Sequence, residues 1–153
     1  MVIGVISDTH GQLTQKALKA LEESQMIIHA GDIGDPNVLE KLREIAPVYA
    51  VRGNTDRARW AQGIPMTQVV EIENLLIFVI HDISMLDLDP KAGGFDAVIY
   101  GHSHIPKEEW QDGVLYFNPG SAGPKRFRLP ICLGRIRITE GEIEKVELIN
   151  LET

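Results

Sequence analysis

Seven side chains that can bind a cation lie just beyond apolar segments of this chain. They are two aspartates, one asparagine and four histidines: Asp8, His10, Asp32, Asn54, His81, His102 and His104. Any one of them alone has a simpler explanation, as a helix cap, a turn former or a structural histidine. The chain has five histidines, however, and four of them follow apolar runs. This joint pattern favours a shared site.

Oxygen and imidazole donors without a thiolate suit Mn, Fe, Zn, Co or Ni, whereas calcium would need more oxygens. Seven donors are too many for one tetrahedral ion, but two ions that share a bridging carboxylate would use them. Two metals about 3.5–4 Å apart can clamp a phosphoryl group and acidify a bridging water into a hydroxide nucleophile. The expected chemistry is therefore in-line attack on phosphorus.

The remaining histidine and the single cysteine are predicted to be structural. His29 lies within the apolar segment "MIIHAGD", whose strand already supplies Asp32, so we interpret it as a structural residue or a support for the ligands. Cys132 is the only cysteine, which excludes an intramolecular disulfide and a zinc-finger type of site. We expect it to pack in the core as a small apolar residue.

The first half of the chain alternates strands and helices. Strands are predicted at 2–7, 26–30 and 48–51, and helices at 14–24 and 35–45. Asp35 is the expected N-cap of the second helix, with Pro36 at its first position. This alternation predicts a parallel sheet with right-handed crossovers. Ligands of such sheets bind beyond the carboxyl ends of the strands, where the candidate donors lie.

The second half of the chain has antiparallel patterns. Hairpins are predicted in 67–81, 107–118 and 132–151, with turns at Glu73-Asn74, Asp112-Gly113 and Glu140-Gly141, and a buried strand in 95–102. The fold class is therefore α/β, with two sheets or one large mixed sheet and helices outside. At 153 residues we expect one domain over 1–153.

Composition narrows the classes of partner. A net charge of −7 differs from that of nucleic-acid binders, and the basic cluster Lys125-Arg126-Phe127-Arg128 is interpreted as a solvated face. The longest apolar run, "NLLIFVI", is too short for a membrane span, and the N-terminus lacks the basic start of a signal peptide. The cytoplasm is the expected location.

The ordered motifs Asp8-Thr9-His10, Gly31-Asp32, Gly53-Asn54, His81 and Gly101-His102-Ser103-His104 resemble those of calcineurin-like metallophosphoesterases. Asn118-Pro119-Gly120-Ser121 further resembles a segment of their small, single-domain phosphodiesterase branch. The glycine-aspartate, glycine-asparagine and GHxH elements are specific in this order, although each is weak alone.

The resemblance implies a four-layer α/β/β/α sandwich with mixed sheets and a dinuclear centre. It assigns Asp8, His10, Asp32 and His104 to a first metal. It assigns Asn54, His81 and His102 to a second, with Asp32 bridging. Asn54 would also contact the substrate phosphate. Mn is the expected metal, with Fe, Ni, Zn or Co as alternatives. The expected partner is a small phosphoester, with no nucleic acid and no membrane; a homo-oligomer is compatible with the sequence.

Two residues depart from the family pattern. Many relatives have a histidine at the position of Thr55, where it protonates the leaving group or binds phosphate; some of the small branch have cysteine. Threonine is a poor general acid, so Thr55 is a weak catalytic candidate. His81 is usually followed by glycine, and here Asp82 follows it. Its carboxylate is expected to repel a dianionic monoester more than a monoanionic diester.

The leading interpretation is a metal-dependent phosphoesterase that acts on phosphodiesters. The first alternative is a protein-binding scaffold that resembles the retromer subunit of the same fold, although all seven donors are intact here. An amidohydrolase would need a barrel of eight βα units, for which the chain is short. A P-loop or Rossmann nucleotide binder is disfavoured because neither glycine-rich motif occurs.

Overall fold

The computed structural model describes residues 1–152 as two five-stranded sheets stacked face to face. The first sheet has the strand order β10-β9-β1-β2-β3. Its strands are β1 (Val2–Ile6), β2 (Met26–His29), β3 (Val48–Ala50), β9 (Cys132–Thr139) and β10 (Glu142–Asn150). β1, β2 and β3 pair in parallel, as the sequence predicts. β9 returns from the end of the chain and pairs antiparallel with β1.

The second sheet has the order β4-β5-β6-β8-β7. Its strands are β4 (Thr67–Ile72), β5 (Leu75–Ile80), β6 (Ala97–Ile99), β7 (Lys107–Gln111) and β8 (Val114–Asn118). β6 lies in parallel between β5 and β8, while the β4–β5 and β7–β8 pairs are antiparallel. The mixed α/β fold class predicted from the sequence is confirmed.

The three predicted hairpin turns occur where expected. Both central residues have positive φ in each turn: Glu73 and Asn74, Asp112 and Gly113, and Glu140 and Gly141. Two consecutive residues of this kind make the type of turn that suits the right-handed twist of paired strands. These turns fix the register of β4–β5, β7–β8 and β9–β10.

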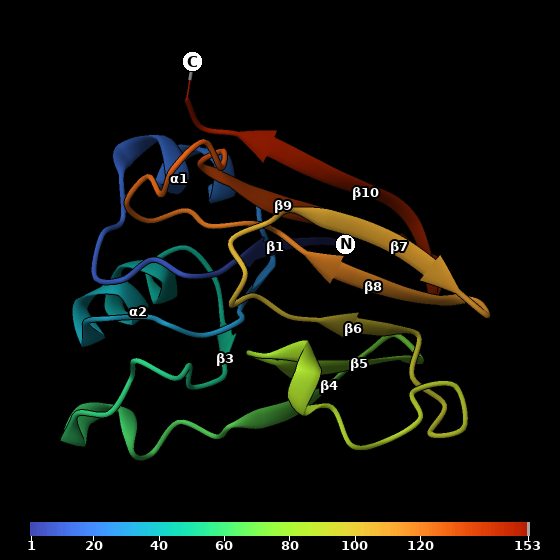
Figure 1. The fold of residues 1–153 in the computed structure, drawn as a ribbon. Helices are drawn as coiled ribbons and strands as arrows, with labels where there is room; N and C mark the ends of the chain where they lie inside the picture. Colours follow the sequence, from blue (N-terminus) through green and yellow to red (C-terminus); the bar gives the residue numbers. More distant parts are fainter. Residues whose placement is uncertain (153) are drawn as a thin grey trace.

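Two helices cover the outer face of the first sheet. They are α1 (Gln15–Leu21) and α2 (Pro36–Arg43), which lie side by side in Figure 1. Asp35 caps α2 as predicted, because its Oδ1 accepts a hydrogen bond from the Asn37 N–H at 2.8 Å, and Pro36 takes the first helical position. Buried leucines of both helices, such as Leu21 and Leu42, pack against the sheet.

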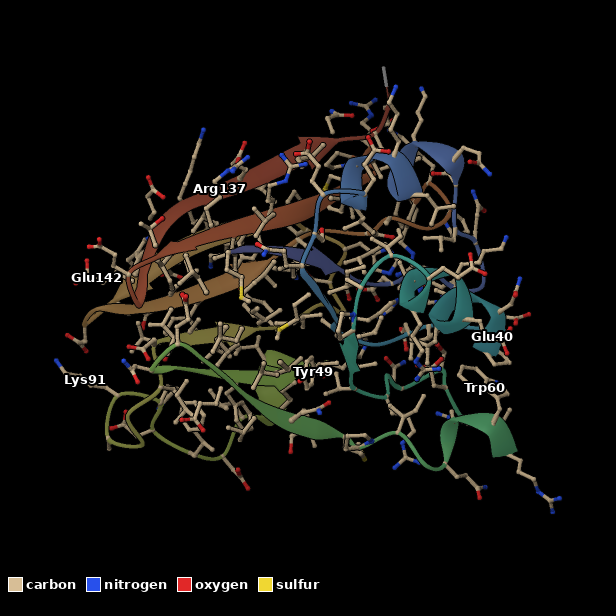
Figure 2. All side chains as sticks on the ribbon, turned by 180° about the vertical axis from the view of Figure 1, so that it is seen from behind. Glu40, Tyr49, Trp60, Lys91, Arg137 and Glu142 are labelled. Atoms are coloured by element: carbon tan, nitrogen blue, oxygen red, sulfur yellow. The ribbon has the colours of Figure 1, made fainter. Side chains whose placement is uncertain are left out.

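The principal core fills the space between the two sheets. Side chains such as Ile3, Ile28, Ile77 and Phe117 are fully buried there. Tyr49 packs partly buried against the same core, and Figure 2 labels it near the middle of the molecule. This core holds the strands of both sheets in fixed relative positions, and with them the loops that follow the strands.

The outer face of the second sheet has a thinner cover than a complete α/β/β/α sandwich provides. Its apolar residues, including Phe78 and Tyr100, pack against Ile83, Leu86 and Phe95 of the segment between β5 and β6. The segment between β5 and β6 contains one 3-10 helix, η2 (Ile83–Met85). Another 3-10 helix, η1 (Arg59–Ala61), lies elsewhere, between β3 and β4. Among residues 1–152, no helix has the length and apolar character that crossing a bilayer requires.

Candidate metal centre

The seven predicted donors converge in one place, at the carboxyl ends of five strands. Asp8, Asp32 and Asn54 follow β1, β2 and β3 of the first sheet. His81 follows β5 directly, and His102 and His104 follow β6 of the second sheet. The site therefore lies where loops from the two sheets meet, and neither sheet could form it alone.

One group of donors consists of Asp8, His10 and His104. Asp8 Oδ1 lies 3.3 Å from His104 Nε2 and 3.9 Å from His10 Nε2. The two histidine Nε2 atoms are 3.4 Å apart. Asp8 and His104 are buried, whereas His10 is partly exposed, which leaves this group open on one side.

A second group forms around His81. Its Nε2 lies 3.2 Å from Asp32 Oδ2, 3.9 Å from Asp8 Oδ1 and 3.0 Å from Asn54 Oδ1. Asn54 Oδ1 is in turn 3.2 Å from His102 Nδ1. The side chain of His102 is 45% exposed, so this group also faces solvent on one side.

Both aspartates lie close to both groups. Asp32 Oδ2 is 3.8 Å from His10 Nε2 in the first group and 3.2 Å from His81 Nε2 in the second. Asp8 Oδ1 likewise reaches His104 in the first group and His81 in the second, at 3.3 and 3.9 Å. Either carboxylate therefore has the position that a bridging ligand needs.

The residues present fit divalent cations. Two donors about 2.1 Å from one tetrahedral ion lie roughly 3.4 Å from each other, which is close to the separations within each group. Asp8 Oδ1 is also buried without a hydrogen-bond partner among residues 1–152, as is His104 Nδ1. A buried carboxylate oxygen without a partner is costly, and a cation would satisfy it.

Backbone strain is concentrated at these donors. Five of the seven have positive φ although none is a glycine: Asp8 (55°), His10 (46°), Asp32 (55°), His102 (72°) and His104 (64°). Side chains with a Cβ seldom adopt this region, and such residues tend to gather at functional sites. The conformation turns the donors back toward a common point instead of letting each strand continue.

Two glycines in the motifs admit donors from neighbouring loops. A Cβ on Gly53 would lie 2.1 Å from Asp32 Oδ1, and one on Gly101 would lie 2.6 Å from Asp8 Oδ2. Real Cβ atoms do not approach other atoms so closely. The glycine before Asn54 therefore makes room for Asp32, and the glycine before His102 makes room for Asp8.

Hydrogen bonds from neighbouring groups orient the two carboxylates. Asp8 Oδ2 accepts from Ser7 Oγ at 2.6 Å and from the His102 N–H at 3.1 Å, which directs Oδ1 toward the histidines. Asp32 Oδ1 accepts from the Thr55 N–H at 3.0 Å, which leaves Oδ2 for the donor cluster. Such supporting bonds hold metal ligands in position.

The carboxylates and His81 shift the pKa values of one another. Burial raises the pKa of Asp32, but hydrogen bonds from His81 and from the Thr55 N–H outweigh it and hold the pKa well below its usual range. Burial lowers the pKa of His81, whereas the hydrogen bond to Asp32 and the charges of Asp8 and Asp32 raise it above 6.5. Without a metal the cluster thus stabilises a proton on His81, and a cation would replace this positive charge.

His29 lies outside both groups, in agreement with the structural role expected for it. It is fully buried, and its Nδ1 accepts from the Gly31 N–H at 3.1 Å. Its Nε2 therefore carries the proton and donates to Thr9 Oγ1 at 3.0 Å, and Thr9 donates to the Ile33 carbonyl at 2.8 Å. This series of hydrogen bonds holds Thr9 in place between the donors Asp8 and His10. Desolvation lowers the pKa of His29 to about 4, so the ring is neutral.

Three supporting features have a role at the site that the sequence did not reveal. The first is the carboxylate of Asp56, which is buried and accepts hydrogen bonds from the N–H groups of Ile33, Gly34 and Gly53 at 2.9 to 3.0 Å. It joins the loop after β2 to the loop after β3, and thereby Asp32 to Asn54. Aspartate in a turn is a common local signal, but that signal does not reveal distant N–H partners.

The second feature is the segment Asn118-Pro119-Gly120-Ser121, for which the sequence suggested only a resemblance. Asn118 Nδ2 donates to the Gly101 carbonyl at 3.0 Å, next to His102. Ser121 Oγ donates to the Asp8 carbonyl at 3.0 Å. The segment after β8 therefore ties together the loops that carry donors from both sheets.

The third feature is the position of the basic cluster. Lys125 and Arg126 line a hollow of about 260 Å³ together with His10 and His104. The interpretation of this cluster as a mere solvated face is therefore incomplete, because two of its cations border the first group of donors. The neighbouring Phe127 is 88% exposed.

Asp82 lies on the other side of the donors. Its Oδ2 is 3.8 Å from His102 Nε2, while its Oδ1 accepts from Ser84 N–H and Oγ at 3.0 and 2.8 Å. Burial raises the pKa of Asp82, but the hydrogen bonds from Ser84 and the charge of His102 hold the pKa below its usual value. A negative charge therefore stands at the edge of the second group.

A sandwich of two mixed sheets with aspartate, histidine and asparagine donors at the strand ends defines a metallophosphoesterase-type protein. Residues 1–141 match the model of the calcineurin-like phosphoesterase superfamily domain. The chain belongs to this superfamily, as the motif resemblance implied.

Named relatives of this chain support the same family. A probable metallophosphoesterase of Methanothermobacter thermautotrophicus is 33% identical, over 97% of this chain and 92% of its own. A phosphodiesterase of Methanocaldococcus jannaschii is 35% identical, over 78% and 83% of the two chains. The phosphodiesterase YfcE of Escherichia coli is 30% identical, over 85% and 84%.

Solved structures share the fold. An archaeal phosphodiesterase superposes with a TM-score of 0.82 and 30% identity, over 98% of this chain and 99% of its own. Vps29 of Entamoeba histolytica, solved in complex with Zn²⁺, gives a TM-score of 0.78 at 22% identity, over 99% and 100% of the two chains. At that identity the likeness to Vps29 concerns the fold alone.

Proposed function

We propose that this protein is a phosphodiesterase with a dinuclear divalent metal centre, with Mn²⁺ as the fitting ion. The observation that carries the proposal is the convergence of seven nitrogen and oxygen donors around Asp8 Oδ1, a buried oxygen without a partner among the described residues. When bound, the two ions would supply Lewis acidity and a bridging hydroxide for in-line attack on phosphorus.

We assign the first ion to Asp8, His10, Asp32 and His104, and the second to Asn54, His81 and His102, with Asp32 shared. The position of Asp32 Oδ2 between His10 and His81 supports the shared role. Asp8 Oδ1 competes for it, since it also reaches both groups. Asn54 offers its amide to the second group, and the NH2 group of that amide can donate to a phosphate oxygen.

The charges around the site support an anionic substrate. Two divalent ions, two carboxylates and one hydroxide would leave a net charge of about +1 at the centre, which attracts phosphate although the whole chain is negative. Arg126, beside His10 and His104, adds a cation at one edge, where Lys125 is ion-paired with Glu152. Asp82 adds a negative charge at the other edge, where it disfavours a second phosphate charge.

The test begins with chelator-treated protein that is reloaded separately with Mn, Ni, Zn or Mg. Each form is assayed on a phosphate monoester and a diester that share the p-nitrophenolate leaving group. We expect metal-dependent turnover that is greater on the diester, and greatest with Mn. Equal or greater turnover of the monoester would contradict the diester preference, and no metal-dependent turnover of either ester would contradict the enzyme.

The alternative is a protein-binding scaffold without catalysis. Its support is the fold that this chain shares with Vps29. The presence of all seven donors favours the enzyme, because a scaffold has no need of a strained donor cluster. A stable protein partner together with inactivity in every metal form would favour the scaffold. We further propose that residues 1–153 form one domain and that the protein is cytoplasmic.

A further inference from the structure

A second hollow lies beside the candidate metal centre, on the side away from Lys125 and Arg126. Its volume is about 510 Å³, and it shares Asn54 and His81 with the second group of donors. Met66, Ile80 and Met85 form its apolar wall, and the hollow is called the methionine pocket below. A molecule held by phosphate at the donors would have this pocket within reach of one of its ester groups.

The wall of the methionine pocket is apolar yet open to solvent. Met66 is 62% exposed and Met85 is 69% exposed, although both are large apolar side chains. They come from two different segments of the chain: Met66 directly precedes β4, and Met85 is the last residue of η2. Methionine is flexible and polarisable, so two such side chains can adjust around a ring. Exposed apolar surface next to a site often marks where a ligand packs.

The charged groups of the methionine pocket disfavour an anionic occupant. Asp82 and Asp87 line it, so an additional phosphate would meet two carboxylates. Arg52 also lines it, and no hydrogen bond or ion pair involves its guanidinium within residues 1–152. An arginine without an ionic partner can stack on the face of an aromatic ring.

We propose that the methionine pocket binds the neutral, ring-bearing ester group of a phosphodiester. This inference rests on the proposed function and adds a substrate class to it. The two edges of the centre then differ: Arg126 adds a positive charge at one edge, and the methionine pocket takes the uncharged substituent at the other.

The test measures binding instead of turnover. Methyl(phenyl)phosphinate and dimethylphosphinate are both monoanions at neutral pH, as a phosphodiester is, and they have no ester bond to hydrolyse, so their affinities for the Mn-loaded protein differ through the ring. We expect calorimetry to show about tenfold tighter binding of methyl(phenyl)phosphinate, since a ring buries apolar surface that methyl lacks. In the double variant Met66→Ser, Met85→Ser this preference should fall to about threefold or less.

Phe127→Ser is the matched control, because it removes an exposed apolar side chain from the edge beside Arg126. It should leave the tenfold preference intact. Equal affinities of the wild-type protein for the two phosphinates would overturn the methionine pocket, and so would loss of the preference in Phe127→Ser but not in the double variant. Failure of the proposed function is a separate result, since it would appear as absent metal-dependent turnover of diesters.

Discussion

Thr55 helps to position Asp32, and its side chain offers little acid catalysis. Its N–H donates to Asp32 Oδ1 at 3.0 Å, and its exposed side chain hydrogen-bonds to the same carboxylate. A threonine hydroxyl does not give up a proton at neutral pH, so the leaving group needs another proton source or must leave as an anion.

Thr55→His should therefore help poor leaving groups selectively. We expect kcat for an alkyl leaving group to rise about tenfold or more, because an imidazole can protonate the departing oxygen. Turnover of a p-nitrophenyl ester should change little, because p-nitrophenolate leaves without a proton. Steady-state kinetics on two diesters that differ only in leaving group would measure this. A parallel change on both would contradict the role assigned to this position.

The carboxylate of Asp82 leads to a second prediction, which concerns selectivity between phosphate monoesters and diesters. Asp82→Asn removes the charge beside His102 and can keep the hydrogen bonds from Ser84 to Oδ1. The ratio of kcat/KM for monoester over diester should rise about threefold to tenfold, because a dianion gains more than a monoanion from losing a nearby negative charge. The same assay on Asp87→Asn, which also lines the methionine pocket, provides the control. An unchanged ratio in Asp82→Asn would refute the electrostatic role.

His29 makes the stability of the metal-free protein depend on pH. Its pKa is about 4 in the folded state against 6.5 unfolded, so below pH 6.5 the unfolded chain binds a proton that the folded chain does not bind. Stability is therefore complete above pH 6.5 and falls as the pH decreases toward 4. His29 should account for about 2 kcal/mol of loss between pH 7 and pH 5.

Urea unfolding of the metal-free wild type and of His29→Gln at both pH values would isolate this contribution. The variant keeps a donor for Thr9 but cannot titrate, so its stability should fall less by about 2 kcal/mol. Equal losses in the two proteins would show that His29 is not the group responsible.

The loops after β2 and β3 act as one unit because Asp56 connects them. Three backbone N–H groups depend on its buried carboxylate, two in the loop of Asp32 and one in the loop of Asn54. No other residue in the described part of the chain accepts a hydrogen bond from these three N–H groups.

Asp56→Ala should therefore destabilise the protein by about 2–4 kcal/mol, since it leaves buried donors without acceptors. It should also weaken metal binding, because Asp32 and Asn54 lose their common support. The control is Asp35→Ala, which removes an exposed helix cap and should cost about 1 kcal/mol. Thermal unfolding and metal titration of both variants would measure the two effects. Equal destabilisation by the two variants would contradict the importance of the connection.

Most elements could be predicted from the sequence because local signals specify them. Apolar runs located the strands, Asp35 and Pro36 located the start of α2, and residues such as Asp112-Gly113 located the hairpin turns. The pairing of β9 with β1 could not be predicted in this way. It joins segments more than a hundred residues apart, and only the shared core selects that partner.

The candidate site, too, could be predicted from the sequence only where local signals specify it. The donors could be listed from the sequence because each follows a strand, and strand ends meet at one edge of a sheet. The links of Asp56 to Gly53 and Ile33, and of Ser121 to Asp8, escaped prediction. They are bonds between loops, whose partners depend on how the two sheets stack.

At the scale of the whole molecule, the stacked sheets bring five strand ends together and leave an asymmetric surface around them. The core between the sheets fixes the loops that carry the donors. Arg126 and the ion-paired Lys125 border the centre on one side, and a methionine-lined hollow with two carboxylates and Arg52 borders it on the other. A diester with one neutral substituent matches this asymmetry better than a compact dianion does.

The most direct test of the account is the number of metal ions per chain, measured by elemental analysis after equilibrium dialysis against Mn²⁺. The wild type should hold two ions and gain diesterase activity with them. Asp32→Ala should lose both ions, whereas Asp8→Ala should lose chiefly the first, and His29→Gln should keep both. A wild type that holds fewer than two ions, or an Asp32→Ala variant that keeps both, would contradict the dinuclear centre bridged by Asp32.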